Sequence, residues 1–115
     1  MLRPVALALS SLAAVVLAAA CGSPTPTDDC DNIASVICQK LFQCAETVAD
    51  QTYGNESACE TKLQSQYSCA TWACPSGQTY DGSEAEACID AYDDLSCADI
   101  TQQPSQCQNL GPACH

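Results

Sequence analysis

Hydrophobic positions recur with a helical period in the part of the chain that follows a Pro-rich stretch. Over residues 29–46 apolar and cysteine side chains repeat at the helical spacing of about 3.6 residues, and polar side chains take the opposite face. The apolar face consists of Cys30, Ile33, Ile37, Leu41 and Cys44, with Cys38 at its margin. Asp28 or Asp29 is expected to cap this helix, because an acidic side chain accepts hydrogen bonds from the free N–H groups of a first turn.

Two further helices are expected over residues 57–70 and 83–97. The sequences "SACE" and "SEAE" at their starts each fit a capping box, formed by Ser57 with Glu60 and by Ser83 with Glu86. Their apolar faces hold Cys59, Leu63 and Tyr67 in the first helix and Ala85, Cys88, Ile89, Tyr92 and Leu95 in the second. No segment shows a convincing period of two. The expected fold class is therefore all-α, a small disulfide-stapled bundle of about three helices with a loop-rich C-terminal segment.

The start of the chain has the plan of an export signal. Arg3 is its only charge, and an apolar run extends from Val5 to the small residues that precede Cys21. A membrane-spanning helix needs about 20 apolar residues, but this run stops at Cys21 and "GSPTPTDD" follows. We expect residues 1–20 to be a signal peptide.

Cys21 has two interpretations. In the first, ordinary signal peptidase cuts after Ala20 and leaves Cys21 with a thiol that is free or paired. In the second, "LAAAC" resembles a bacterial lipobox, in which Cys21 becomes a diacylglycerylated N-terminus. The match to the lipobox is not ideal, because Ala18 stands where leucine is more usual. The cysteine count favours the lipid, because the chain has eleven cysteines and only an even number can pair completely. Residues 21–28 would then be the lipidated cysteine and a flexible tether, ahead of a cysteine-rich helical domain over residues 29–115.

The predicted lipid anchor also predicts which membrane the protein is attached to. Two or three acyl chains anchor a protein stably, which a single chain scarcely does. Gly22 follows the cysteine, where an aspartate would signal inner-membrane retention in enterobacteria. The expected location is the bacterial outer membrane, on its periplasmic or its surface face.

The charge balance narrows the range of partners. Beyond the signal the chain carries two basic residues, Lys40 and Lys62, against fourteen acidic ones. Such a surface argues against nucleic-acid binding, which needs basic contacts to phosphates, and against docking on anionic lipid without a covalent anchor. The expected partners are the membrane through the N-terminal lipid and an envelope protein or a cationic molecule.

Ten cysteines after Cys21 indicate a disulfide framework rather than a metal site. No C-x-x-C motif, the usual mark of zinc sites and redox dithiols, is present. The expected bridge residues, whose connectivity the sequence leaves open, are Cys30, Cys38, Cys44, Cys59, Cys69, Cys74, Cys88, Cys97, Cys107 and Cys114. Two cysteines on one continuous helix are separated by about 1.5 Å for each residue between them, while a disulfide needs Cα atoms within about 7 Å. Cys30 with Cys38, Cys38 with Cys44 and Cys59 with Cys69 are thereby excluded, so the bridges are expected to join helix to helix or helix to loop.

Catalytic chemistry has little support in the sequence. The one histidine, His115, is the last residue, where a side chain is usually frayed and solvated. The runs Asp93–Asp94 and Asp28–Asp29–Asp31 are expected to be solvated surface, since adjacent helix residues point in different directions. Asn55-Glu56-Ser57 fits the N-glycosylation pattern, but it overlaps the predicted helix N-cap, and capping is the preferred explanation of these residues. Trp72 is expected to be a core residue. No catalytic, cofactor-binding or metal-binding residue is predicted.

The segment "GQTYDGSEAEACIDAYDDLSCADI" and the "PSQC" that follows it resemble a pattern in small, uncharacterised cysteine-rich lipoproteins of myxobacteria and related bacteria. The matching positions are Tyr80, Asp81, Cys88, Ala91, Leu95, Ser96, Cys97, Pro104 and Cys107, with the helical cysteines Cys38 and Cys44 upstream. This family has no known activity. The resemblance therefore implies a location and an architecture, not a mechanism.

Three functions remain open at this point. The first is a non-enzymatic envelope lipoprotein, a disulfide-locked structural or binding module displayed on a lipid anchor. The second is a carrier of a small ligand or lipid, which would need a continuous apolar cavity above about 300 Å³ between the helices. The third and weakest is a secreted enzyme or enzyme inhibitor.

Overall fold

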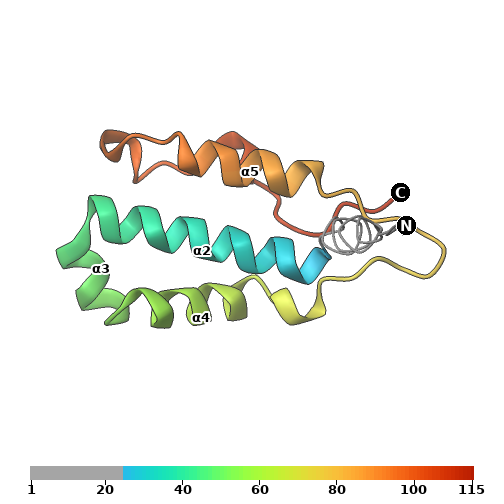
Figure 1. The fold of residues 1–115 in the computed structure, drawn as a ribbon, viewed down its shortest axis with the longest axis horizontal. Coiled ribbons are helices and arrows are strands. Elements are labelled where there is room, and N and C mark those ends of the chain that lie inside the picture. Colours follow the sequence, from blue (N-terminus) through green and yellow to red (C-terminus); the bar gives the residue numbers. More distant parts are fainter. Residues whose placement is uncertain (1–24) are drawn as a thin grey trace, which may run out of the picture.

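The computed structural model describes residues 25–115, and this part of the chain is mostly helical (Figure 1). Its elements are α2 (Pro26–Cys44), α3 (Glu46–Tyr53), α4 (Glu56–Gln66) and α5 (Ser83–Asp93), with the short 3₁₀ turns η1 (Cys69–Thr71), η2 (Cys97–Asp99) and η3 (Ser105–Cys107). Residues 25–115 form no strand beyond an isolated antiparallel bridge between Tyr80 and Cys114. The predicted all-α, disulfide-stapled fold is confirmed. None of the helices in this range is long and apolar enough to cross a membrane.

Helix α2 is the centre of the bundle. It packs against α4 on one side and α5 on the other, and α5 runs in the same direction as α2 while α4 runs back (Figure 1). One end of the bundle, here called the N-terminal end, holds the start of α2, the loop of residues 72–82 and the C-terminal residues 112–115. The opposite end, here called the α3 end, holds α3 and the loop of residues 94–104.

Helix α2 begins earlier than the sequence predicted. Its cap is Thr25, whose hydroxyl accepts from the N–H of Asp28 at 3.1 Å while the Asp28 carboxylate accepts from the Thr25 N–H at 3.5 Å. Pro26 occupies the first helical turn, where its missing N–H and fixed φ are tolerated. The predicted cap at Asp28 or Asp29 is therefore wrong, and residues 26–28, assigned to the tether, belong to the helix.

Helix α4 is also shifted from its predicted bounds. Asn55, two residues before the predicted cap Ser57, caps it by accepting from the Ala58 N–H at 2.7 Å. Ser57 lies inside the first turn, and the box with Glu60 is not formed. The helix ends at Gln66 rather than near residue 70, because Ser68 adopts a left-handed φ of 56° that a helix cannot continue through.

Helix α5 starts where predicted but has a different cap and a shorter length. The Asp81 carboxylate accepts from the Ser83 N–H at 2.9 Å, and no side-chain capping bond is formed by Ser83, so the second predicted box is also wrong. The helix ends at Asp93, and Cys97 lies in the separate turn η2. Asp93 and Asp94 stand at its C-terminal end, where negative charge opposes the helix dipole.

Helix α3 was not predicted. It fills the interval between the first two expected helices with one buried residue, Ala49. Its other apolar side chains are Val48, which is 63% exposed, and the half-buried Tyr53. A helix with so narrow a buried stripe produces almost no periodic signal.

All ten cysteines of the described chain are paired. The bridges are Cys30–Cys69, Cys38–Cys59, Cys44–Cys97, Cys74–Cys114 and Cys88–Cys107. None joins a pair that helix geometry excluded. Cys74–Cys114, however, joins two loops, contrary to the expectation that each bridge would involve a helix. The hydrogen bonds between residues 79–81 and 113–115 hold these loops side by side.

The bridges divide the domain into two closed halves. Cys38–Cys59 lies inside the loop closed by Cys30–Cys69, and Cys88–Cys107 lies inside the loop closed by Cys74–Cys114. We call residues 30–69 the first half and residues 74–114 the second half. Cys44–Cys97 is the one bridge between the halves. The peptide connection between them is residues 70–73.

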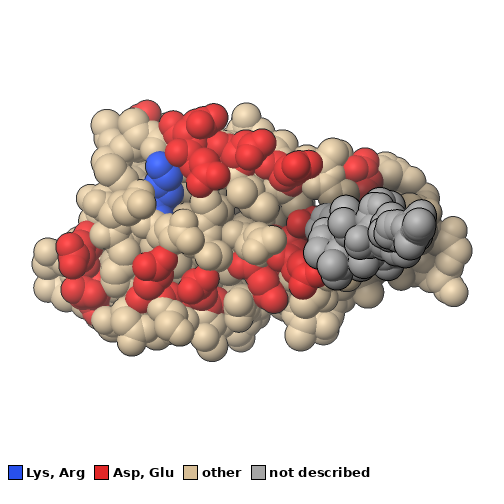
Figure 2. Space-filling view, viewed as in Figure 1, with Lys and Arg blue, Asp and Glu red and all other residues tan. Residues whose placement is uncertain are grey.

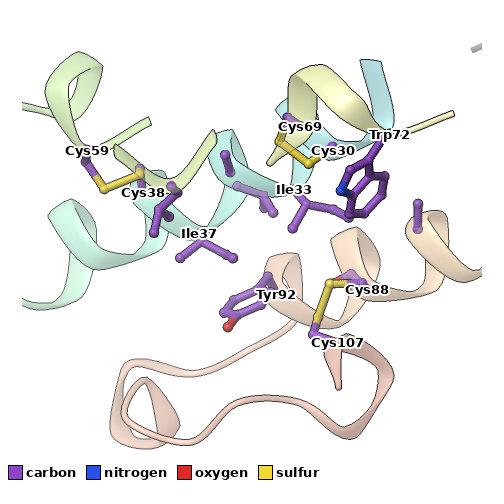
Figure 3. Packing of buried hydrophobic residues seen from close by; sticks show 14 residues of the cluster. Cys30, Ile33, Ile37, Cys38, Cys59, Cys69, Trp72, Cys88, Tyr92 and Cys107 are labelled. Atoms are coloured by element: carbon purple, nitrogen blue, oxygen red, sulfur yellow. A yellow bond between two sulfur atoms is a disulfide. The ribbon is translucent and has the colours of Figure 1, made fainter. Parts of the chain in front are cut away.

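The hydrophobic core is built in large part from the bridges themselves. Ile33, Ile37, Trp72 and Tyr92 lie among three disulfides (Figure 3). The buried cysteines are Cys30, Cys38, Cys59, Cys69, Cys88 and Cys107. Cys38, predicted at the margin of the apolar face, is fully buried because α2 is covered on two sides. Covalent bonds therefore replace much of the apolar surface that a domain of this size would otherwise need.

Candidate functional site

The N-terminal end of the bundle holds one buried carboxylate. Asp29, in the first turns of α2, is 7% exposed and is the one charged residue of the described chain that is buried. The Tyr80 hydroxyl donates to its Oδ2 at 2.7 Å. Burial, followed by this hydrogen bond to Asp29, raises the pKa of Tyr80 far above its usual value. The pair fastens the loop of residues 72–82 to α2.

His115 lies beside this pair and is held in place. Its backbone N–H donates to the Thr79 carbonyl at 2.9 Å, and its carbonyl accepts from the Thr79 N–H at 2.7 Å. Its Nε2 is 3.6 Å from Asp81 Oδ2. The expectation that His115 is frayed is therefore wrong for its backbone, because the loop pairing and the Cys74–Cys114 bridge fix this end of the chain.

The Asp81–His115 pair has no nucleophile beside it among residues 25–115. The Ser83 backbone N–H, more than the imidazole of His115, lowers the pKa of Asp81. The His115 side chain is 74% exposed and that of Asp81 44%. Within residues 25–115 no hydroxyl or thiol is hydrogen-bonded to His115, so the geometry of a Ser–His–Asp site is not assembled there.

A hollow lies between the start of α5 and residues 106–111. Its apolar lining is Ile33, Trp72, Ala85 and Leu110, and its polar lining includes Glu84, Gln106, Gln108 and Asn109. It encloses about 20 Å³, which is room for about one water molecule. The adjoining depression of about 330 Å³ is open to solvent and lined mainly by polar side chains.

Acidic side chains form separate patches along both flanks of the bundle, as the face in Figure 2 shows. Helix α5 and its C-terminal cap carry Glu84, Glu86, Asp90, Asp93 and Asp94, all exposed. Glu86, Asp90 and Asp94 are four residues apart, a spacing at which like charges repel. Asp93 and Asp94 therefore lie on solvated surface, as predicted. No three His, Cys, Asp or Glu side chains of residues 25–115 converge as metal ligands would.

The other predicted residues have different outcomes. Cys21, the predicted lipidation site, lies outside the described residues. Trp72 is buried in the core, as predicted. The prediction that Asp29 lies on solvated surface is wrong, because Asp29 is buried and bonded to Tyr80, 51 residues away in the chain. The Tyr-Asp turn at Tyr80 was noted, but no pattern in the sequence indicates its partner.

Comparison with known proteins adds no relative, since no protein family, no curated protein and no solved structure matches the chain.

Substitution of Tyr80→Phe tests the bond to the buried carboxylate. We expect the free energy of unfolding at pH 7 to fall by about 1–2 kcal/mol, because Asp29 is left buried without its donor. The variant should also be less sensitive to alkali. The pKa of Tyr80 is raised on folding, so the folded state holds a proton that the unfolded chain loses near pH 10, and wild-type stability falls above that pH. Urea denaturation between pH 7 and 11 measures both effects, and equal pH dependence in the two proteins would contradict this account.

Gly82→Ala tests how closely the loop approaches Asp29. A Cβ at residue 82 would lie 2.9 Å from Asp29 Oδ2, closer than real contacts allow. We expect a loss of about 1–2 kcal/mol of stability, because the carboxylate has to move from the Tyr80 hydroxyl. Gly111→Ala is the matched control, since a Cβ there meets nothing within 4 Å. Equal melting temperatures for the two variants would refute the close approach.

Proposed function

We propose that this protein is a non-enzymatic cell-envelope lipoprotein, a disulfide-locked helical module displayed on a lipid anchor at Cys21. The observation that carries the proposal is the complete pairing of the described cysteines. Five bridges use all ten cysteines of residues 25–115, and the chain has eleven. Cys21 is the one left over, at the position where the lipobox pattern places the acylated residue.

The bridges also support export. Disulfides persist in oxidising compartments such as the periplasm and the cell surface and are rare in a reducing cytoplasm. Six of the ten paired cysteines are buried and form part of the core, so the fold depends on oxidation. The apolar run over residues 5–20 supplies the export signal that such a fold requires.

The packing supports a display module rather than a carrier. A cavity for a small ligand or lipid needs about 300 Å³ of enclosed apolar space. The hollow beside the core has only about 20 Å³, and Trp72, Ile33 and the bridges fill the centre of the described domain. The function is then carried by the outer surface, whose acidic flanks suit a cationic molecule or an envelope protein with a basic face.

Cys21→Ala tests the anchor. We expect palmitate labelling to be abolished and the protein to move from the membrane to the soluble fraction, because the thiol that accepts the diacylglyceryl group is removed. Ser23→Ala is the matched control and should keep both the palmitate label and the membrane association. The mass of the peptides after proteolysis without reductant should show the same five bridges in both variants. Unchanged labelling in Cys21→Ala would disprove the anchor.

A further inference from the structure

We infer that the N-terminal end of the bundle is a membrane-proximal surface, and that the domain stands with α2 directed away from the bilayer. The inference rests on the proposed lipid anchor at Cys21. It adds an orientation to that proposal and identifies the end of the domain that faces the lipid headgroups.

The first observation is the short chain between the anchor and the folded domain. The capping box and the 3.0 Å hydrogen bond from the Asp29 N–H to the Thr25 carbonyl make Thr25 the first residue tied to the helix. Gly22, Ser23 and Pro24 alone separate it from Cys21. Four Cα–Cα steps span at most about 14 Å. The headgroup layer on each side of a bilayer is about 5–8 Å deep, so the N-terminal end is held within or just above the headgroups.

The second observation is that the flanks of the bundle do not suit an anionic surface. Helix α5 presents Glu86, Asp90 and Asp93 to solvent, and α4 presents Glu56 beside the half-buried Glu60. A domain lying on its side would bring one of these helices within a Debye length, about 8–10 Å, of anionic lipid. The two lysines are too few to balance the charge of these flanks. Lys40 donates to the Leu95 carbonyl at 3.1 Å, and Lys62 lies 5.7 Å from the centre of the Tyr53 ring in α3.

The third observation is that the short connection keeps the N-terminal end near the membrane whether the domain stands or lies on its side, so the acidic residues of this end, among them Asp28 and Glu84, do not distinguish the two poses. Asp29 is bonded to the Tyr80 hydroxyl, and Asp81 lies 3.6 Å from the His115 imidazole. Helices α2 and α5 both begin at this end (Figure 1), so the positive ends of their dipoles point to the membrane. The short connection thus holds the N-terminal end near the bilayer, and the acidic flanks favour the upright pose over the lying one.

The orientation places the α3 end outermost. Helix α2 has 19 residues, which corresponds to a length of about 28 Å. Helix α3 and the loop of residues 94–104 would project into the periplasm or the medium. This end is where a soluble partner would meet the module first.

The experiment measures energy transfer from tryptophan to a headgroup dye. Trp72, the one tryptophan of the chain, lies near the N-terminal end, where its carbonyl accepts from the Thr27 hydroxyl at 3.5 Å. The full lipoprotein is reconstituted in vesicles of phosphatidylethanolamine and phosphatidylglycerol with dansylated phosphatidylethanolamine as acceptor. The W72F/F42W variant moves the donor from beside Ile33 to residue 42, about 14 Å along α2. We expect its transfer efficiency to be at least twofold lower than that of Trp72 in the wild type.

A second variant keeps Trp72, so its result does not depend on how the core packs around the two substitutions of W72F/F42W. Ten Gly-Ser residues inserted between Ser23 and Pro24 lengthen the connection and should reduce transfer from Trp72 at least twofold. Equal transfer from the two donor positions, or unchanged transfer after the insertion, would overturn the orientation while the palmitate label shows that the anchor is intact. Absence of the label and of vesicle association would overturn the anchor itself, and the orientation with it.

Discussion

Substitution of Cys44→Ala and Cys97→Ala together is expected to let the domain separate into two pieces after a single cut between Ala73 and Cys74. The first and second halves are each closed by two nested bridges, and Cys44–Cys97 is the one covalent link between them besides residues 70–73. Once that link is removed and the peptide is cut, α2 and α5 are held together by packing alone. Denaturation without reductant should then release two fragments.

The test uses a protease site inserted between Ala73 and Cys74, in a stretch where Ala73 is exposed. The same site in the wild-type chain should give one band on a non-reducing gel and two bands after reduction. Cys88→Ala with Cys107→Ala is the matched control, because that bridge is internal to the second half and its loss should leave one non-reduced band. A single non-reduced band from the cut C44A/C97A chain would show that another bridge crosses between the halves. In the uncut variant we also expect a loss of about 3 kcal/mol of stability.

Trp72→Ala is expected to lower the free energy of unfolding by about 3–5 kcal/mol, the range for truncation of a large buried aromatic side chain. Trp72 is 7% exposed and lies beside Ile33 in the core (Figure 3). Its indole Nε1–H donates to the Tyr67 carbonyl at 2.9 Å, so the substitution also leaves that acceptor without its donor. Urea denaturation of the oxidised protein measures the loss.

Two controls make the result specific. Val48→Ala changes a side chain that is 63% exposed, and it should alter stability by less than about 0.5 kcal/mol. Trp72→Phe keeps most of the apolar volume and should lie between the wild type and Trp72→Ala. A loss below about 1 kcal/mol for Trp72→Ala would mean that the crosslinks alone hold the fold.

The sequence predicted the parts of the fold that repeat along a helix. The spacing of Cys30, Ile33 and Ile37 places three side chains on one face of α2, and all three are buried. The cysteine count and the absence of C-x-x-C predicted disulfides, and five are present among residues 25–115. These signals are local or arithmetical, so they can be read without knowing the tertiary structure.

The remaining features depend on contacts between distant residues. The predicted capping side chains of all three helices are wrong, because Thr25, Asn55 and Asp81 supply the oxygens that accept from first-turn N–H groups, and the tertiary path decides which of several nearby polar side chains is used. The bond between Asp29 and Tyr80 and the loop-to-loop bridge Cys74–Cys114 arise where segments far apart in the chain meet. Sequence reasoning also left three functions open, and for residues 25–115 the structure adds an acidic surface and a filled core.

The nested arrangement of the bridges has a consequence for biosynthesis. If the chain enters an oxidising compartment from its N-terminus, the partners of Cys38 and Cys30 arrive 21 and 39 residues later, respectively. Cys44 has to wait for Cys97, 53 residues downstream. Until Cys97 arrives, Cys44 is a reduced thiol that can form a non-native disulfide with Cys30, Cys38, Cys59 or Cys69, whose native partners are other cysteines. Correct maturation therefore depends on keeping Cys44 from premature oxidation, and errors at this residue are the ones that a disulfide isomerase would have to repair.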